Sequence, residues 1–332
     1  MTQPAIPVIH SISDGAALIT TVLCEYPIPK HHSCKLYKRG LNDTYLVTTE
    51  RENYILRVYR RGWRNKEEID FELELLVFLH EQKQLFAYPI ARNDGIFTTE
   101  ILAPEGVRYA VLFTYAPGRA VNHNLDGKQS YILGEVLANI HQALDILKNN
   151  FNRPALNNEY LLDWSMKGIT SLYQHRKHHI NYLQQEIDKI KSQLRLIKLP
   201  LSQPEYGICV GDVHSGNAHF TERNEPTLFD FDQCGYGWRA FDIGKFWQVA
   251  LKMNIDIAVI NSFIEGYQTI RQLSEVELAA IPVFVKAAHI WVMGISTNVV
   301  GDVLPYGWFT DEWLDQQLAM LRSLDENDNF VQ

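Results

Sequence analysis

The chain has 332 residues, of which 46% are hydrophobic, and its formal net charge is -8. This length provides a sizeable core in one or two domains, and the negative charge argues against a nucleic-acid surface, which needs clustered Lys and Arg. The four cysteines lack metal-ligand spacing, no leading apolar segment marks a signal peptide, and no run long enough to cross a bilayer is apparent. We therefore expect a cytoplasmic protein without a nucleic-acid or membrane partner.

Residues 37–60 predict two or three strands. Tyr45, Val47 and Thr49 alternate with polar positions, and a polar turn at 50–53 leads into a second apolar run at 54–59. The first turn of this hairpin contains four small or polar residues, Gly40, Asn42, Asp43 and Thr44. Backbone amides in such a turn can approach phosphate oxygens, although a glycine alone is equally an ordinary turn residue.

Three further elements follow before the middle of the chain. Residues 67–82 have helical spacing, residues 109–114 form an apolar strand ended by 115–118, and residues 129–147 form an amphipathic helix that carries His141. We expect His141 to pack against a loop rather than to bind a ligand.

A charge-rich helical region extends over residues 160–196 and includes the basic stretch H-R-K-H-H at 175–179. Its apolar residues form two stripes. We interpret the basic stretch as a solvated helix face or turn rather than a metal or phosphate site.

The most informative segment is 206–246. Asp212 and Asn217 lie five residues apart in a loop that follows a strand at 208–210 and precedes a short strand at 217–220. Asp230 lies at the end of a further strand, predicted at 227–231. Asp and Asn are also common turn formers, but this ordered set across two linked motifs favours a catalytic interpretation.

Such a set suits phosphoryl transfer, which needs positioning and charge neutralisation more than covalent chemistry. One carboxylate, Asp212, would face the acceptor hydroxyl and take its proton. A second carboxylate, Asp230, and the amide oxygen of Asn217 would hold magnesium, which prefers oxygen ligands.

The pair of motifs resembles the aminoglycoside phosphotransferase and choline kinase family, including homoserine kinase type II-like members, whose usual signature reads H-G-D-x-H-x-x-N followed by a hydrophobic-Asp-aromatic-acidic segment. Val210 replaces the first His of that signature, which removes a support of the loop and leaves the acid-base and metal positions intact. His214 and Asp242 match positions that brace the loop. Asp232 is a further metal ligand or a supporting group.

The resemblance also assigns roles in the N-terminal part. It implies that the turn at Gly40, Asn42 and Thr44 covers phosphate, and that Arg57 replaces the usual strand Lys that binds nucleotide phosphates. An Arg on an exposed edge strand is the alternative. Glu72 would hold Arg57 in place, with Glu68 as the second candidate. The backbone from Phe113 to Tyr115 would contact adenine.

The acceptor is less defined. Aromatic and acidic side chains in the C-terminal region would suit a cationic acceptor through cation-π and ionic contacts, or they pack helices with a solvated acidic face. These residues are Trp291, Asp302, Tyr306, Trp308, Phe309, Asp311, Glu312, Trp313 and Asp315.

The resemblance implies an α+β, two-lobed protein-kinase-like fold, with a nucleotide-binding lobe at 1–115 that holds a small antiparallel sheet and a mostly helical catalytic and acceptor-binding lobe at 116–332. It implies an ATP- and Mg²⁺-dependent phosphotransferase acting on a hydroxyl of an amino alcohol, a hydroxy amino acid or an aminoglycoside. The aliphatic residue before Gly211 also resembles stress-response Ser/Thr kinases, which leaves a protein acceptor as the alternative. A non-catalytic nucleotide-binding regulator is a third class, against which the intact Asp212, Asn217 and Asp230 argue.

Overall fold

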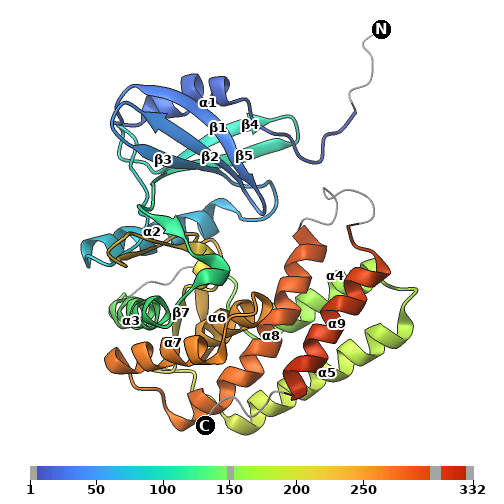
Figure 1. Cartoon of the computed structure of the whole chain (residues 1–332). Helices are drawn as coiled ribbons and strands as arrows, with labels where there is room; N and C mark the ends of the chain where they lie inside the picture. The colour runs from blue at the N-terminus through green and yellow to red at the C-terminus, as the bar shows by residue number, and fades with distance from the viewer. Residues whose placement is uncertain (1–5, 148–152, 300–307, 327–332) are drawn as a thin grey trace. The chain divides into compact units, whose positions relative to one another are not determined.

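The computed structural model describes residues 6–147, 153–299 and 308–326. The chain divides into two compact units, of which the first comprises Met1–Val77 with Ala87–Ala116 and the second comprises Phe78–Phe86 with Pro117–Gln332. Each unit has its own sheet and helix arrangement (Figure 1).

The first unit is built on a five-stranded antiparallel sheet with the strand order β1-β2-β3-β5-β4. Its strands are β1 (His31–Arg39), β2 (Asp43–Thr49), β3 (Asn53–Val58), β4 (Thr98–Ala103) and β5 (Gly106–Thr114). Helix α1 (Gly15–Thr21) and the 3-10 turn η1 (Leu23–Glu25) pack on this sheet. The shared core contains Leu18, Val22, Leu23, Tyr45, Val47, Leu56, Val58 and Leu112, among others.

The predicted hairpin is confirmed as β2 and β3. In β2 the side chains alternate between buried and half-buried, so Tyr45, Val47 and Thr49 point into the unit. This period of two is what one apolar face of a pleated strand requires. The same pairing places Thr44 of β2 opposite Arg57 of β3.

Helix α2 (Lys66–Glu81) agrees within one residue at each end with the predicted helix at 67–82. It begins with a capping box, in which the backbone N–H of Glu68 donates to Asn65 Oδ1 at 2.9 Å and that of Asn65 to Glu68 Oε2 at 2.8 Å. The predicted apolar stripe is buried at Ile69, Leu73, Leu76 and Leu79. The capping box gives Glu68 a structural task at the start of the helix.

The second unit is mainly helical. Its α-helices are α3 (Gly127–Leu144), α4 (Trp164–Leu172), α5 (Lys177–Ile197), α6 (Ala240–Lys252), α7 (Ile257–Ile270), α8 (Glu275–Val299) and α9 (Asp311–Glu326). Its short turns are η2 (Asn122–Asn124), the π-helical η3 (Glu159–Asp163) and η4 (Ser215–Asn217). Helix α3 packs on α7, and α4 and α6 pack on α8.

Two small antiparallel sheets complete the second unit. One pairs β7 (Tyr206–Cys209) with β10 (Gly235–Trp238), and the other has the order β6 (Arg119–Ala120), β8 (Ala218–Phe220), β9 (Pro226–Leu228). The predicted strand at 217–220 therefore begins one residue later, because Asn217 belongs to the turn η4. The predicted strand at 227–231 was too long, because β9 ends at Leu228, before Asp230, whose φ of 68° is incompatible with a regular strand.

The charge-rich region predicted as helical over 160–196 is broken by a turn. Helix α4 ends at Leu172 and α5 starts at Lys177, with Arg176 as its N-cap residue. The basic stretch at 175–179 spans this turn and the start of α5, in agreement with the interpretation as a turn or helix face.

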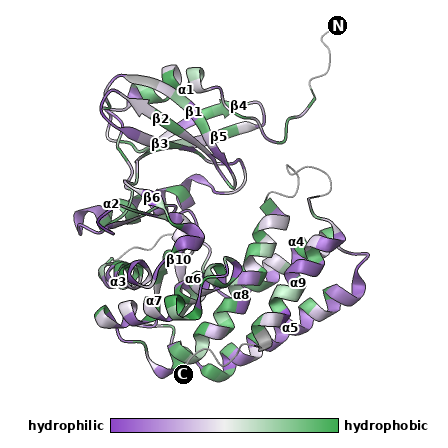
Figure 2. Cartoon of the chain, viewed as in Figure 1, coloured by the Kyte–Doolittle hydropathy of each residue, from purple (hydrophilic) through white to green (hydrophobic). Residues whose placement is uncertain are grey.

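Helix α8 corrects the expectation that no run could cross a bilayer. By length and composition it is the one such helix in the described ranges, with a mean hydropathy of 1.8 in its most apolar window, but 78% of that window is buried (Figure 2, largely green). Burial of this extent is typical of the core helix of a globular unit. Figure 2 shows the opposite case in α5, which exposes a hydrophilic face.

The burial of His289 in α8 predicts a pH-dependent stability. Its side chain is 2% exposed, and its Nε2–H donates to the carbonyl of Gln317 in α9 at 2.9 Å. Burial lowers the pKa of His289 to about 4, although the Gln317 carbonyl opposes this shift. Because the unfolded chain binds the proton near pH 6.5, stability is intact above that pH and falls as the pH drops toward 4.

Between pH 7 and pH 5 this group is expected to cost about 2 kcal/mol of unfolding free energy. Urea unfolding at both pH values checks this, with His289→Gln expected to show a smaller decrease than the wild type. The exposed His178 provides the control, since His178→Gln should follow the wild type. Equal decreases in all three proteins would contradict the assignment.

Candidate active site

The loop that carries Asp212 follows β7 through a glycine whose conformation is constrained. Gly211 has φ of 87°, a region that favours glycine, and a Cβ at this position would collide with the backbone carbonyl of Gln233. The loop therefore reverses tightly against the segment after Asp232. This close approach fixes the backbone immediately before Asp212.

Asp242, in the first turn of α6, holds the same backbone from the other side. It is fully buried, and its carboxylate accepts hydrogen bonds from the backbone N–H groups of Val210 and Gly211, both at 2.7 Å. His141 Nε2 lies 2.9 Å from Asp242 Oδ2, and His141 Nδ1 lies 2.9 Å from the hydroxyl of Tyr267. Burial lowers the pKa of His141 to about 4. The ring is therefore neutral at pH 7, with Nε2–H donating to Asp242 and Nδ1 accepting from Tyr267.

Asp212 is held by charged and polar neighbours. The ammonium of Lys245 lies 2.7 Å from Asp212 Oδ1, Asn217 Nδ2 donates to Asp212 Oδ2 at 3.2 Å, and His214 Nε2 lies 3.6 Å from Oδ1. Its side chain is 25% exposed. Burial raises the pKa of Asp212, but the charge of Lys245 and the contacts with His214 outweigh this and lower it overall. Asp212 is thus an ionised carboxylate in a fixed orientation.

Asn217 connects Asp212 to Asp230. Its Nδ2 donates to the backbone carbonyl of Asp212 at 3.0 Å as well as to the carboxylate, so its Oδ1 is the face of the amide available to a cation. Its own carbonyl accepts from the backbone N–H of Phe229 at 3.0 Å, which places Asp230 one residue from this contact. The left-handed backbone of Asp230 is uncommon outside glycine and is of the kind found at functional sites.

These donors fit a hard cation. Asn217 and Asp230 offer an amide oxygen and a carboxylate, and Mg²⁺ is usually bound by one or two protein ligands with phosphate oxygens and water. Within residues 6–147, 153–299 and 308–326, no group of three His, Cys, Asp or Glu side chains could hold a metal. Asp232 is 1% exposed, and its backbone carbonyl accepts from Arg153. Asp232 stays a predicted metal ligand or supporting group.

His214 braces the loop locally. Its Nδ1 accepts from the backbone N–H of Gly216 at 3.0 Å, so it caps the short turn η4. Ser215 Oγ donates to the carbonyl of Asn122 at 2.8 Å. The ring of His214 therefore supports the turn that presents Asn217.

In the first unit, Arg57 and Glu72 form a buried ion pair. Arg57 Nη1 lies 2.6 Å from Glu72 Oε1, and the hydroxyl of Tyr59 donates to Glu72 Oε2 at 2.8 Å. The guanidinium lies 4.8 Å from the ring centroid of Phe113. Arg57 is 8% exposed and β3 is a central strand, which rules out an exposed edge-strand Arg. The structure brings Glu72 against Arg57.

We expect Glu72→Gln to weaken nucleotide use, because the buried guanidinium of Arg57 would lose its charged partner. The variant should raise the KM for ATP or lower kcat by about tenfold or more, which corresponds to about 1.4 kcal/mol. Initial rates of ATP turnover over a range of ATP concentrations measure both. Glu67→Gln, the same change at an exposed position of the same helix, should stay within about threefold. Equal effects of the two substitutions would refute the assignment of Glu72.

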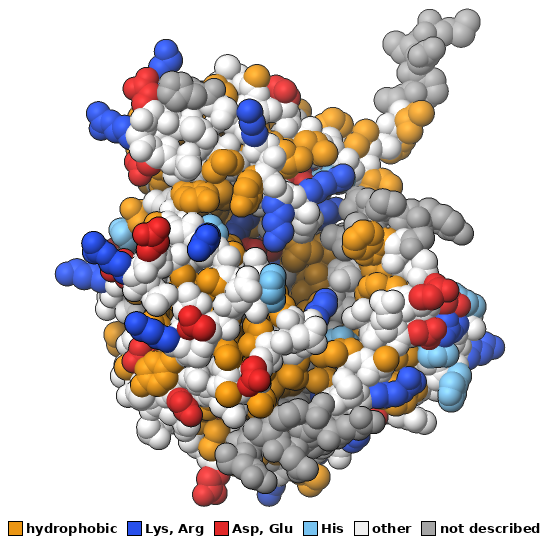
Figure 3. All heavy atoms as spheres, viewed as in Figure 1, with side chains coloured by type: hydrophobic (Ala, Val, Ile, Leu, Met, Phe, Trp, Pro, Cys, Tyr) orange, Lys and Arg blue, Asp and Glu red, His pale blue; other side chains and the backbone are white. Residues whose placement is uncertain are grey.

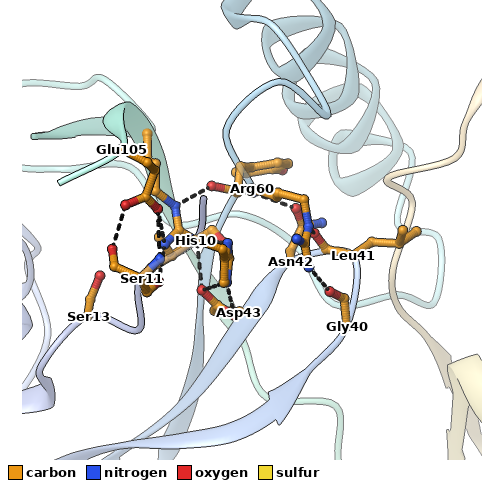
Figure 4. Close-up of polar contacts among 12 residues, drawn as sticks. His10, Ser11, Ser13, Gly40, Leu41, Asn42, Asp43, Arg60 and Glu105 are labelled. Atoms are coloured by element: carbon orange, nitrogen blue, oxygen red, sulfur yellow. Dashed lines mark hydrogen bonds and ion pairs between the residues drawn. The ribbon is translucent and has the colours of Figure 1, made fainter. Parts of the chain in front are cut away.

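The predicted phosphate-covering turn between β1 and β2 is fixed by Arg60 (Figure 4). Arg60 Nη2 donates to the carbonyl of Gly40 at 2.8 Å, Arg60 Nε donates to that of Leu41 at 3.1 Å, and the backbone N–H of Arg60 donates to Asn42 Oδ1 at 3.1 Å. The side chain of Asn42 is therefore turned inward and 8% exposed. Asn42 shapes the turn in this structure, while contact of the turn with phosphate stays a prediction.

The strand that follows the turn is anchored as well. Asp43 is fully buried, with Arg108 Nη2 2.7 Å and His10 Nε2 3.0 Å from its Oδ2 (Figure 4). Ser11 donates to Glu105 Oε2 at 2.7 Å, which ties the N-terminal segment to the start of β5. These contacts make the base of the turn rigid.

The adenine contact predicted for the backbone of Phe113 to Tyr115 stays a prediction. The backbone N–H of Thr114 already donates to the carbonyl of Tyr88 at 3.0 Å. Phe113 is 5% exposed, and its ring packs beneath Arg57.

The described residues of the C-terminal cluster favour the helix-packing alternative over a cation site. Trp291 is fully buried beside Phe241, and Trp313 stacks on Tyr173 at 6.1 Å. The carboxylates of Asp311 and Asp315 form ion pairs with Arg176 at 2.8 and 2.5 Å. Figure 3 shows acidic, basic and histidine side chains gathered here, where the turn before α5 meets the start of α9. Asp311 and Asp315 are thus paired within the protein, and Asp302 and Tyr306 lie outside the described residues.

A known family model matches this combination. The model, described as a phosphotransferase enzyme family, covers residues 35–277, which include Arg57 and Glu72 of the first unit and Asp212 to Lys245 of the second. The chain belongs to this phosphotransferase family. It is therefore a phosphotransferase of the small-molecule kinase group, with a hydroxyl as acceptor.

Relatives and solved structures agree with this membership. An uncharacterized protein of Synechocystis sp. is 39% identical over 324 residues, 98% of this chain and 89% of that protein. A homoserine kinase of Rhizobium rhizogenes is 26% identical over 270 residues, 78% of each chain.

Two solved structures share the kinase-like fold. An amicoumacin kinase in complex with AMP-PNP, Ca²⁺ and Ami has a TM-score of 0.75 at 20% identity, covering 93% of both chains. A microcompartment-associated aminopropanol kinase has a TM-score of 0.71 at 19% identity, covering 93% of this chain and 95% of the other.

Sequence reasoning missed two residues of this phosphotransferase. Lys245 was not singled out, although it lies one helical turn after Asp242 and so shares a helix face with a residue that braces the loop. Arg60 was not singled out either. Its contacts with Gly40 and Leu41 depend on the pairing of β2 and β3, which local sequence does not show.

Proposed function

We propose that this phosphotransferase transfers the γ-phosphoryl group of ATP to a hydroxyl of a small molecule, with Mg²⁺ as the required ion. The proposal rests above all on the chain of contacts from Lys245 through Asp212 and Asn217 to the residue before Asp230. This arrangement supplies an ionised carboxylate next to an oxygen donor set for a hard cation, which phosphoryl transfer requires.

Each residue has a defined task in this proposal. Asp212 orients the acceptor hydroxyl and takes its proton as the oxygen attacks phosphorus, while ADP leaves with the electron pair of the broken P–O bond. Asn217 and Asp230 would hold Mg²⁺, which when bound neutralises charge on phosphate oxygens. Arg57, fixed by Glu72, would bind phosphate oxygens of the nucleotide, with the β1–β2 turn adding backbone contacts.

The acceptor class is drawn from the family. Amino alcohols, hydroxy amino acids and aminoglycosides are the candidates, and the names of the aminopropanol kinase and the homoserine kinase support the first two. A cytoplasmic location also belongs to this proposal, because ATP is found there and the four free cysteines would stay reduced.

Purified protein incubated with Mg²⁺ and γ-labelled ATP against a panel of these acceptors tests the proposal. Label on one small molecule, lost on chelation of the ion, would support it. Label only on generic protein substrates or on the enzyme itself would replace it by the protein-kinase alternative. Nucleotide binding without transfer to any acceptor or to water would favour a regulator.

A further inference from the structure

Lys245 combines deep burial with an incomplete set of hydrogen bonds. Its side chain is 4% exposed, and in the part of the chain that the structure describes its one ion-pair partner is Asp212, at 2.7 Å. An ammonium group carries three N–H donors. One donor is used by Asp212, so within residues 6–147, 153–299 and 308–326 two remain for water or a bound ligand.

An oxyanion would satisfy these two donors most strongly. Burying an ammonium is costly unless its donors are satisfied, and charge-assisted bonds to oxyanions are the strongest way to satisfy them. The carboxylate of Asp212 accepts from one of the three N–H groups of Lys245. Phosphate-type oxygens next to Asp212 would accept from the other two.

The position of Lys245 is set by the same helix turn that fixes the catalytic loop. Asp242 and Lys245 are three residues apart in α6 and therefore project from one face. Asp242 locks the backbone of Val210 and Gly211, and Lys245 reaches the side chain of Asp212. Any shift of α6 would move both contacts together, so the ammonium is held in register with the loop.

The two oxygens of Asp212 point to different neighbours. Oδ1 faces Lys245 and Oδ2 faces Asn217, which is the candidate ligand of the ion. An acceptor hydroxyl on Asp212 would therefore lie between a fixed cation and the ion-binding amide. The phosphorus that it attacks has to be within bonding reach of that hydroxyl, which brings the phosphoryl oxygens close to the ammonium of Lys245.

We propose that Lys245 is a further catalytic residue, which donates hydrogen bonds to the oxygens of the transferring phosphoryl group while it remains paired with Asp212. This inference rests on the proposed function. In the reaction, the acceptor oxygen forms the new bond to phosphorus, the bond to the ADP oxygen breaks with its electron pair going to ADP, and the hydroxyl proton passes to Asp212. Lys245 keeps its proton throughout and stabilises the charge on the phosphoryl oxygens.

The inference is tested without knowledge of the acceptor by measuring the affinity of the full-length protein for Mg·ADP with and without aluminium fluoride, an anionic mimic of the transferring phosphoryl group. In the wild type, aluminium fluoride is expected to increase the affinity for Mg·ADP. Lys245→Met should bind Mg·ADP alone within about threefold of the wild type, but should lose roughly 10- to 100-fold of the tightening. Lys245→Arg, which keeps the charge, should retain part of it.

Lys252→Met is the matched control, because it removes one lysine charge from the same helix two turns farther on. Aluminium fluoride should increase the affinity of Lys252→Met for Mg·ADP as much as it does in the wild type. Thermal unfolding checks that each variant is folded, and if Lys245→Met is not, the Lys245→Gln variant takes its place, with the same loss expected.

The inference is overturned if Lys245→Met tightens as much as the wild type, if Lys252→Met loses as much as Lys245→Met, or if the wild type binds Mg·ADP but shows no tightening. Failure of the proposed function has a different signature, namely that the wild type neither binds Mg·ADP nor transfers label from ATP.

Discussion

Replacing Asp212 by Asn is expected to lower the rate of phosphoryl transfer by about 10²- to 10⁴-fold, the range typical of a lost general base. The amide keeps the shape of the carboxylate but cannot take the hydroxyl proton. Nucleotide affinity should stay within about threefold, because the phosphate contacts proposed for Arg57 do not involve this side chain. Initial rates with the acceptor found in the label assay, or with water, give the first quantity, and equilibrium binding of a non-hydrolysable ATP analogue gives the second.

The substitution also removes the charged partner of the buried Lys245, so folding has to be checked by thermal unfolding. Asp188→Asn is the control, because Asp188 is exposed on α5 and, among the residues that the structure describes, accepts one hydrogen bond, from Gln184 at 2.9 Å. A folded Asp212→Asn protein with nearly wild-type turnover would remove Asp212 from its catalytic role.

The second large effect is expected from Asp242→Asn, which should destabilise the protein by about 3 kcal/mol and lower turnover as well. Three donors converge on the carboxylate, namely two backbone N–H groups of the catalytic loop and the ring of His141. An amide would present its own NH₂ group to at least one of them, leaving a buried donor without an acceptor. Since Asp212 follows Gly211 directly, a relaxed loop would also displace the catalytic carboxylate.

Urea unfolding at pH 7.5 measures the stability and initial rates measure the turnover. The same substitution at Asp256 is the control, because this exposed N-cap of α7 accepts from Ala258 and Asn caps a helix about as well, so the change should stay within about 0.5 kcal/mol. A loss below about 1 kcal/mol for Asp242→Asn would show that the loop does not depend on this carboxylate.

The ion pairs of the C-terminal part also bear on where the acceptor should be sought. The carboxylates of Asp311 and Asp315 are paired with Arg176 and lie close to His175 and His179, so both are already engaged within the protein. The acceptor is better sought around Asp212, where the protein contributes an ammonium and an ionised carboxylate.

The sequence alone determined the chemistry-bearing residues that depend on spacing along the chain. Asp212 and Asn217 lie in one short loop, so a local motif is enough to bring them together, and their contact at 3.2 Å follows from that loop. The period of two in β2 and the helical spacing of α2 likewise arise from backbone geometry that every residue repeats. The kinase-like fold and the family followed from these local patterns.

Only the tertiary structure decided the contacts between residues distant in the chain. Glu68 and Glu72 have the same charge and lie on one helix, and the packing of α2 on the sheet selects Glu72 for Arg57 while Glu68 caps the helix. The sequence likewise left the role of the acidic residues near α9 open, and their pairing with Arg176 is seen only in the tertiary structure. Lys245 reaches Asp212 only because α6 packs against the catalytic loop. These differences depend on burial. A buried charge requires a partner of opposite charge, whereas a similar charge at the surface is solvated by water.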